Sequence, residues 1–208
     1  MKRLAIYGAS GHGKVVADIA GLTGWQSIEF FDQAAEDIQK NGIWPVQGTF
    51  DDLLRQRVDF DAAVVAIGNN QVRTDRAALL LEAGIELATL IHPSAIIGDH
   101  SAIGRGTVIM ANAVVNPFAA IGDHVILNTG AIIDHDCVID DGVHICPGVN
   151  LAGEVRVGHK AWVGIGASVI QQRHIGENSI VGAGSVVIED VPANITVCGV
   201  PAKPTKSL

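Results

Sequence analysis

An aliphatic residue recurs at every sixth position between residues 91 and 187, and this repeat restricts the possible folds more than any other feature of the chain. Seventeen consecutive positions fit the period without a slip. They are Ile91, Ile97, Ile103, Ile109, Val115, Ile121, Leu127, Ile133, Ile139, Ile145, Leu151, Val157, Val163, Val169, Ile175, Val181 and Val187. A short fixed period is typical of solenoids, in which each repeat packs on its neighbours. The repeat therefore predicts a solenoid over the second half of the chain.

A small residue stands two positions before most of these aliphatic residues. The small residues are Ser101, Thr107, Ala113, Ala119, Ala131, Cys137, Ala161, Ala167, Ser179 and Ser185. Positions two apart share one face of a β-strand, so both kinds of residue are expected to point inward, and the residues after the aliphatic one can turn the chain. Three such strands close a triangular coil of eighteen residues, stacked at roughly 4.8 Å per coil. The second half is therefore predicted to be a parallel β-helix.

The first ninety residues follow a different pattern, in which strand-like and helix-like runs alternate. The runs are LAIYG, GKVVADIAGLTG, SIEFFD, FDDLLRQR, DAAVVAIGNN and VRTDRAALLLEAG. Alternation of this kind is typical of α/β domains built on a parallel sheet. We therefore expect an α/β domain over residues 1–90, followed by the β-helix domain and a C-terminal tail over residues 91–208.

The overall charge and the cysteines exclude several classes of protein. Fourteen Lys and Arg against 22 Asp and Glu give a formal charge of −8, which argues against binding to nucleic acids or to anionic membranes. The apolar run before Gly8 is too short for a signal peptide, and no segment is long enough to span a membrane. Three cysteines without a CxxC pair indicate neither disulfides nor a cysteine zinc site. We expect a cytoplasmic protein with a small-molecule or protein partner.

The stretch IIDHDCVI, residues 132–139, sets a histidine between two aspartates within the repeat. Coils of eighteen residues allow its side chains to be placed by arithmetic. His135 and Asp136 follow an inward aliphatic residue by two and three positions, so they are expected at a corner. The residue one coil further along is Gly153, which has no side chain and leaves space beside the imidazole. His144, half a coil further along, precedes an inward aliphatic residue and is expected to point outward.

A corner histidine beside a carboxylate suits acid-base chemistry. The unperturbed pKa of histidine, about 6.5, allows it to accept a proton at neutral pH. A neighbouring carboxylate orients the ring and raises its basicity. Asp and His are also common at β-helix corners, so a purely structural role stays open. No two histidines after residue 91 lie eighteen or thirty-six residues apart, so no metal site within one chain is predicted.

The glycine-rich stretch GASGHGK follows a predicted strand and begins a predicted helix. In this context backbone N–H groups at the helix start bind phosphates. The stretch lacks the GxGxxG pattern. Gly8, Gly13 and Lys14 fit GxxxxGK, but Val15 replaces the hydroxyl residue that holds magnesium in nucleoside triphosphatases, so ATP hydrolysis is excluded. The alternative is a tight turn with no ligand.

Five stretches carry a resemblance to a known family: YGASGHGK, AIGNN, LIHPSA, DHDC and GVPAK. With the six-residue repeat, they resemble the left-handed β-helix (hexapeptide-repeat) acetyltransferases, in the branch of sialic-acid O-acetyltransferases and UDP-4-amino-sugar N-acetyltransferases of bacterial glycan synthesis. The resemblance implies a Rossmann-like N-terminal domain that binds a nucleotide sugar, and a left-handed coil, opposite to the usual crossover preference. It also implies acetyl-CoA as co-substrate, no required metal, and a homotrimer with CoA between neighbouring helices.

The same resemblance implies roles for individual residues. His135 is implied as the general base and Asp136 as its support. The residues implied for acetyl-CoA binding are His144, Gly153, Ile165 and Ala183. The residues implied for binding the nucleotide sugar are Ser10, Gly11, His12, Asp32, Gln33, Gly68, Asn69 and Asn128. The UDP-sugar enzymes often have two acidic residues where this chain has Asp32 and Gln33, so the identity of the base stays open.

Together with these observations, the resemblance implies an N-acetyltransferase that modifies the amino group of a nucleotide-linked 4-amino-4,6-dideoxy sugar. In the expected reaction the amine attacks the thioester directly and the corner histidine takes its proton. Two alternatives stay open. One is O-acetylation of sialic acid or of another sugar hydroxyl, and the other is a β-helix scaffold without catalysis.

Overall fold

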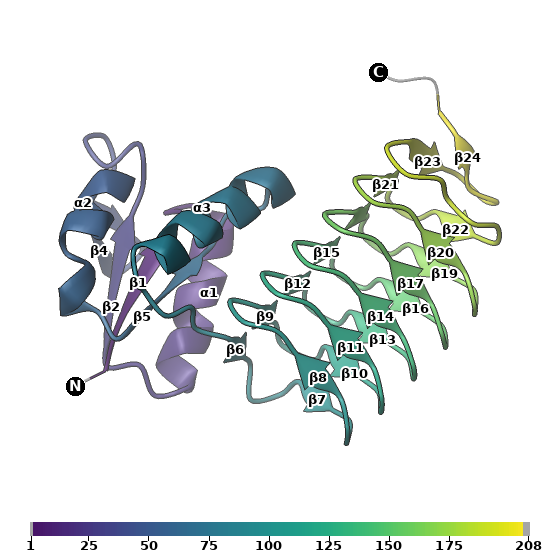
Figure 1. Ribbon diagram of the computed structural model, residues 1–208, viewed down its shortest axis with the longest axis horizontal. Coiled ribbons are helices and arrows are strands. Elements are labelled where there is room, and N and C mark those ends of the chain that lie inside the picture. Colours follow the sequence, from purple (N-terminus) through teal and green to yellow (C-terminus); the bar gives the residue numbers. More distant parts are fainter. Residues whose placement is uncertain (1, 206–208) are drawn as a thin grey trace. The chain divides into compact units, whose positions relative to one another are not determined.

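The computed structural model describes residues 2–205, and the chain divides into two compact units with the boundary between Pro93 and Ser94 (Figure 1). The first unit is an α/β domain and the second is a parallel β-helix. None of the helices within residues 2–205 combines the length and the apolar composition that crossing a lipid bilayer requires.

The first unit is built on a five-stranded sheet in the order β3-β4-β2-β1-β5. Its strands are β1 (Arg3–Tyr7), β2 (Ser27–Phe31), β3 (Lys40–Asn41), β4 (Trp44–Gly48) and β5 (Ala62–Val65). The central strand β1 pairs in parallel with both β2 and β5, and only β3 is antiparallel. The predicted parallel sheet is therefore confirmed, whereas the small β3–β4 hairpin was not predicted. A short strand, β6 (Leu90–Ile91), lies near the end of this unit.

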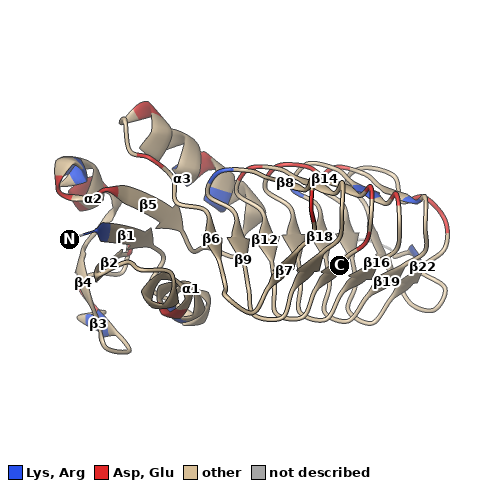
Figure 2. Cartoon of the chain, turned by 90° about the horizontal axis from the view of Figure 1, so that it is seen from below, with Lys and Arg blue, Asp and Glu red and all other residues tan. Residues whose placement is uncertain are grey.

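Helices cover both faces of this sheet. The helices are α1 (Gly11–Leu22), α2 (Phe50–Arg55), the 3-10 helix η1 (Arg57–Asp59) and α3 (Asn70–Glu82). Figure 2 shows α1 on one side of the sheet and α2 with α3 on the other. Local signals fix where two of them begin: the Thr49 side chain forms a capping box with Asp52, and the Asn69 side chain caps α3.

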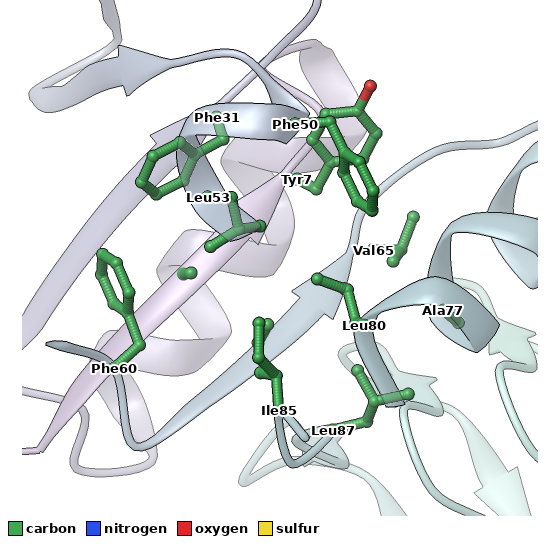
Figure 3. Close-up of a cluster of buried hydrophobic side chains, with 12 residues drawn as sticks. Tyr7, Phe31, Phe50, Leu53, Phe60, Val65, Ala77, Leu80, Ile85 and Leu87 are labelled. Carbon is green, nitrogen blue, oxygen red and sulfur yellow. The ribbon is translucent and has the colours of Figure 1, made fainter. Parts of the chain in front are cut away.

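A buried aromatic and aliphatic cluster joins α2 and α3 to their face of the sheet (Figure 3). The ring centroids of Phe31 and Phe60 lie 5.6 Å apart and those of Tyr7 and Phe50 lie 4.8 Å apart, both in edge-on geometry. Leu80 from α3 is fully buried in the same cluster. Burial of these side chains stabilises the α/β unit, because apolar area removed from water contributes about 25 cal/mol per Å².

The second unit is a stack of triangular coils with three flat faces. The first face contains β7 (Ile96–Ile97), β10 (Val114–Val115), β13 (Ile132–Ile133), β16 (Asn150–Leu151), β19 (Ser168–Val169) and β22 (Val186–Val187). The second face contains β8 (Ala102–Ile103), β11 (Ala120–Ile121), β14 (Val138–Ile139), β17 (Arg156–Val157) and β20 (His174–Ile175). The third face contains β9 (Val108–Ile109), β12 (Ile126–Leu127), β15 (His144–Ile145), β18 (Trp162–Val163), β21 (Ile180–Val181), β23 (Thr196–Cys198) and β24 (Lys203–Pro204).

The pairing register confirms the predicted coil of eighteen residues. Val114 pairs with Ile132, Ala120 with Val138, and so on along each face. The second residue of each strand from β7 to β22 is the predicted inward aliphatic residue, and those from residue 109 to residue 187 are buried. Small polar residues inside the coil are bonded to backbone: the Thr107 hydroxyl donates to the Gly122 carbonyl at 2.8 Å.

Every corner between residues 98 and 186 turns through a residue in the left-handed conformation. This residue is the third after the inward aliphatic residue, and it is Gly at several corners and a side-chain-bearing residue at others. We call the corner that follows first-face strands the first corner, and likewise for the second and third corners. The repeated turn explains how a two-residue strand can be followed at once by a change of direction.

Candidate active site

His135 and Asp136 lie in the first corner, where the turn brings their side chains together. Asp136 is the left-handed residue of this corner, with φ 58. Its Oδ2 atom lies 2.8 Å from Nδ1 of His135. This hydrogen bond, with help from the nearby negative charges, raises the pKa of His135 above its usual value. An Nδ1–H that donates to Asp136 leaves the Nε2 atom free to accept a proton.

Asp134 fixes the backbone on the other side of the histidine. Its Oδ1 atom accepts hydrogen bonds from the backbone N–H of His135 at 2.8 Å and from the side chain of Asn116 at 2.8 Å. These two bonds hold the pKa of Asp134 below its ordinary value, with the backbone bond as the larger cause. Asn116 was not identified from the sequence, although it stands one coil, eighteen residues, before Asp134.

Gly153 lies directly against the imidazole of His135. A Cβ atom at Gly153 would come within 2.6 Å of the Nε2 and Cε1 atoms of the ring. The predicted neighbour is therefore confirmed, but the ring fills the space that the missing side chain leaves. Any larger residue at this position would displace the ring.

His144 lies on the third face, and its surroundings differ from those expected. It belongs to the outward side of β15, as predicted, but only 6% of its surface is exposed. The Trp162 ring lies 4.3 Å away between centroids, and the Asn128 amide nitrogen lies 3.2 Å from Nε2. Trp162 was not singled out from the sequence, although it stands one coil after His144.

A pocket of about 420 Å³ opens beside His144. Its lining includes Asn128, His144, Cys146, Trp162, Ile165 and Ala183. The pocket thus unites three of the four residues that the resemblance implied for acetyl-CoA, together with Asn128, which was expected to contact the sugar. Burial raises the pKa of the Cys146 thiol to about 12, so it stays protonated and is a poor nucleophile.

The fourth residue, Gly153, lies elsewhere on the coil. Gly153 and His135 occupy the corner between the first and second faces, and in a triangular coil that corner is opposite the third face, which carries His144. The pocket beside His144 and a second pocket beside Asp136 share no lining residue. A single chain therefore separates the candidate base from the candidate acetyl-CoA pocket.

In the first unit, the glycine-rich turn connects β1 to α1. Gly8 has φ 115, and a Cβ atom there would lie 2.6 Å from the Ala66 carbonyl oxygen. At Gly13 a Cβ atom would lie 2.2 Å from the Gly8 carbonyl oxygen. Gly11, in contrast, has open space around it and no unusual φ. The turn itself thus explains Gly8 and Gly13 but gives no packing reason for Gly11.

The other predicted residues near this turn gather at the carboxyl ends of β1 and β2. Ser10 is the N-cap residue of α1, but its side chain makes no cap hydrogen bond. Asp32 accepts hydrogen bonds from the N–H groups of Ala9 at 2.7 Å and Ala34 at 2.9 Å, so its carboxylate holds the turn. Gln33, which follows it, is exposed.

His12 and the residues after β5 complete this edge of the sheet. Burial, together with the nearby Arg73 guanidinium, lowers the pKa of His12 to about 4, so the ring is neutral. Arg73 donates to the carbonyl oxygens of Ile67 at 2.9 Å and Gly68 at 3.2 Å, which fixes the loop. The side-chain oxygen of Asn69 accepts a hydrogen bond from the N–H of Val72. Arg73 is fully buried and was not identified from the sequence.

No group of three or more His, Cys, Asp or Glu side chains within residues 2–205 is arranged to hold a metal ion.

Comparison with known proteins places this chain in a family. The sequence profile of the PglD N-terminal domain matches residues 3–79. UDP-N-acetylbacillosamine N-acetyltransferase from Bacillus subtilis is 41% identical over 114 residues, which span 53% of this chain and 52% of that protein. The match to this curated relative thus covers about half of each.

Several solved structures match along nearly the whole chain. A variant of perosamine N-acetyltransferase from Caulobacter crescentus, in complex with CoA and GDP-perosamine, is 35% identical, with a TM-score of 0.96 over 100% of this chain and 98% of that chain. The chain belongs to the hexapeptide-repeat acetyltransferases. Another of these acetyltransferases, the acetyltransferase domain of PglB from Neisseria gonorrhoeae with acetyl coenzyme A, is 40% identical, with a TM-score of 0.94 over 98% and 99% of the two chains.

Membership of the hexapeptide-repeat acetyltransferases confirms the predicted fold class. The chain consists of a Rossmann-like α/β unit and a left-handed parallel β-helix. The left hand, which the resemblance implied against the general crossover preference, is therefore correct for this chain.

Proposed function

We propose that this chain transfers the acetyl group of acetyl-CoA to the amino group of a nucleotide-linked 4-amino-4,6-dideoxy sugar. The observation that carries the proposal is the His135–Asp136 pair, whose free Nε2 atom lies against Gly153. The comparisons support the substrate class, because the relatives include an acetyltransferase named for UDP-N-acetylbacillosamine and one crystallised with CoA and GDP-perosamine.

In the proposed reaction the sugar amine attacks the carbonyl carbon of the thioester. A carbon–nitrogen bond forms, the carbon–sulfur bond breaks, and coenzyme A leaves as the thiolate. Nε2 of His135 accepts the proton that the nitrogen loses, while Asp136 holds the ring through Nδ1 and stabilises the resulting cation. Transfer is direct, because the high pKa of the Cys146 thiol argues against an acetylated cysteine.

The acetyl-CoA arm is proposed to occupy the pocket beside His144. Ile165 and Ala183 supply apolar lining for the pantetheine chain, and the volume of about 420 Å³ suits a slender ligand. His144 and Asn128 supply the polar contacts near the acetyl end, where their side chains already meet.

The nucleotide is proposed to bind the first unit at the glycine-rich turn. Ser10, Gly11 and His12 stand at the start of α1, and the backbone N–H groups at a helix start can bind a phosphate. The open space at Gly11 supports this role, because nothing in the turn itself requires a glycine there. Asp32, Gln33, Gly68 and Asn69 lie at the carboxyl ends of the neighbouring strands, where ligands of parallel sheets bind.

We propose a homotrimer in which the site is shared between chains. The first-corner histidine of one chain and the third-face pocket of another together make the complete site, because one chain keeps them apart. The first face supports such contacts: its outward residues carry no charge, and Ile96 is 62% exposed. Figure 2 shows no acidic or basic residue along β7, β16 and β19 of this face. The number three comes from the resemblance.

The domain roles and the location complete the proposal. The first unit is the nucleotide-sugar-binding domain and the second carries the acetyl transfer. The three cysteines are free thiols, which suits a reducing compartment such as the cytoplasm.

The test is a panel of acceptors with acetyl-CoA. UDP-, GDP- and dTDP-linked 4-amino-4,6-dideoxy sugars are each incubated with the protein, release of the CoA thiol is followed with a thiol reagent, and products are identified by mass and NMR. We expect acetylation at nitrogen of at least one of them. The proposal is contradicted if only the hydroxyls of sialic acid are acetylated, or if no acceptor is acetylated at all.

A further inference from the structure

A second and larger pocket, of about 760 Å³, lies beside the first corner, and of its lining residues only Asp136 has a role in the reaction described above. Its lining residues are Phe118, Asp136, Glu154, Arg156, Gln172, Arg173 and His174. Phe118, Asp136, Glu154 and Gln172 follow one another at intervals of eighteen residues and so form one column along the corner. The pocket therefore runs along the β-helix past the candidate base.

The sequence of the second face explains why this surface is hollow. Its outward positions, paired from coil to coil, are Ala102, Ala120, Val138, Arg156 and His174. Small side chains occupy the first coils, whereas Phe118 projects from the corner beside them and is 59% exposed. Arg156 is the first long side chain on the face. It pairs with Val138, which is two residues from Asp136.

Only some of the charged side chains in the pocket have an ion-pair or hydrogen-bond partner among the residues that the structure describes. Arg173 lies 3.6 Å from the carboxylate of Asp190, and Glu154 accepts a hydrogen bond from Gln172 at 3.2 Å. Within residues 2–205, the Arg156 guanidinium makes no hydrogen bond and no ion pair, and the residue is exposed. The Arg156 guanidinium is thus a planar cation with N–H donors available to a ligand, and it lies one coil away from His135 and Asp136.

We propose that this pocket is a phosphate subsite of the acetylation site, in which the Arg156 guanidinium binds a phosphate ester of one of the two substrates. This inference rests on the proposed function, in which both substrates carry phosphates. A guanidinium matches two phosphate oxygens at once, which neither His174 nor a solvated lysine does. The acidic residues Asp136 and Glu154 both bond to His135, Asp136 through its side chain and Glu154 through its backbone N–H, so an anion is favoured on the Arg156 side of the pocket.

Steady-state kinetics of Arg156→Gln test the inference. The variant is expected to raise KM for one substrate by about tenfold, the size of a charge-assisted hydrogen bond that stays partly in water, with kcat little changed. Arg105→Gln is the matched control, because it removes the same charge from an exposed corner residue outside the pocket. Arg156→Lys should recover part of the loss, since the charge is kept and the paired geometry is not.

Acetyl-dephospho-CoA identifies the source of the phosphate. If Arg156 binds the 3′-phosphate of CoA, wild-type protein loses affinity for this analogue and Arg156→Gln loses nothing further. If Arg156 binds the diphosphate of the nucleotide sugar, KM for the sugar rises instead, and the effect of the analogue is the same in both proteins. If Arg156 instead binds the diphosphate of CoA, Arg156→Gln raises KM for acetyl-CoA and for acetyl-dephospho-CoA by the same factor.

The inference is overturned if Arg156→Gln changes neither KM by more than Arg105→Gln does, or if only kcat falls. Calorimetric titration of CoA and of the nucleotide sugar gives the same comparison without turnover. Failure of the proposed function is seen separately, as a wild-type protein that acetylates none of the acceptors. An active wild type with an unaltered Arg156→Gln variant contradicts the phosphate subsite alone.

Discussion

The first corner of the β-helix and the glycine-rich turn of the α/β unit both hold candidate site residues just after a strand, but they hold them in different ways. At the corner, neighbours come from adjacent coils at a fixed spacing, as with His135 and Gly153 or Asn116 and Asp134. At the turn, the partners come from distant segments, as with Ala9 and Asp32.

The difference decides how each candidate site responds to change. The corner is supported by continuous backbone pairing above and below, so a side chain there can be altered with little effect on the coil. The turn depends on close packing at Gly8 and Gly13, and only Gly11 can be enlarged without a clash. Substitutions at the corner and at Gly11 can therefore separate effects on the reaction from effects on folding.

The largest effect is expected from His135→Ala. Loss of a positioned general base lowers kcat by roughly a hundredfold to ten-thousandfold. His159→Ala is the matched control, because His159 holds the same position, two residues after an inward aliphatic residue, in a second corner. The control should keep near wild-type turnover, measured by thiol release. Equal losses of kcat in both variants would mean that corner histidines stabilise the coil and take no part in the reaction.

Gly153→Ala is expected to lower kcat by roughly tenfold to a hundredfold, because its Cβ atom would displace the His135 ring from its position. The midpoint of thermal unfolding should change little, since Gly153 has no left-handed φ and the coil pairing is unaltered. Wild-type kcat in this variant would show that the contact between ring and glycine has no part in catalysis.

Asp136→Asn is expected to lower kcat less than His135→Ala does. The change keeps a hydrogen-bonding side chain but removes the bond to a carboxylate that raises the pKa of His135. Since the base must be neutral to accept a proton, a lower pKa moves the acidic limb of the kcat/KM profile to lower pH. Both proteins are measured with the same sugar. If the acidic limb lies at the same pH in both, the group that titrates there is not His135.

Gly11→Leu tests the turn and is expected to have the smallest effect on the reaction itself. KM for the nucleotide sugar should rise severalfold while KM for acetyl-CoA and kcat stay nearly unchanged, because a side chain at the helix start blocks a phosphate. Gly21→Leu is the matched control, since Gly21 also has open space and lies at the other end of α1. If Gly11→Leu raises KM for the nucleotide sugar and KM for acetyl-CoA equally, the role of the turn is structural.

The sequence predicted the β-helix unit in more detail than the α/β unit, for a physical reason. A period of eighteen residues fixes which side chains are neighbours, so the spacing alone places Gly153 beside His135. The same arithmetic leads to Asn116 and Trp162, which were overlooked because their polar or aromatic character alone did not indicate a site.

In the α/β unit the pattern predicted the strands and helices but not how the polar groups are used. Asp32 was expected to contact a nucleotide, yet both of its oxygens bind backbone N–H groups of the protein. The buried Arg73 is part of a run that the sequence predicted only as a helix, so its role in fixing the Ile67 and Gly68 carbonyls follows only from the tertiary structure. Burial of His144 likewise depends on neighbouring coils.

The central claim, that the base of one chain serves the acetyl-CoA pocket of another, is tested most directly by mixing two inactive variants. His135→Ala keeps the pocket, and Ala183→Trp fills the pocket but keeps the base. Coexpressed with different tags, they should form mixed trimers in which about one of the three sites combines both intact parts, because the interfaces of a cyclic trimer all run in one direction. We expect isolated mixed trimers to recover activity on that scale. Mixed trimers that are no more active than either variant alone would contradict the claim.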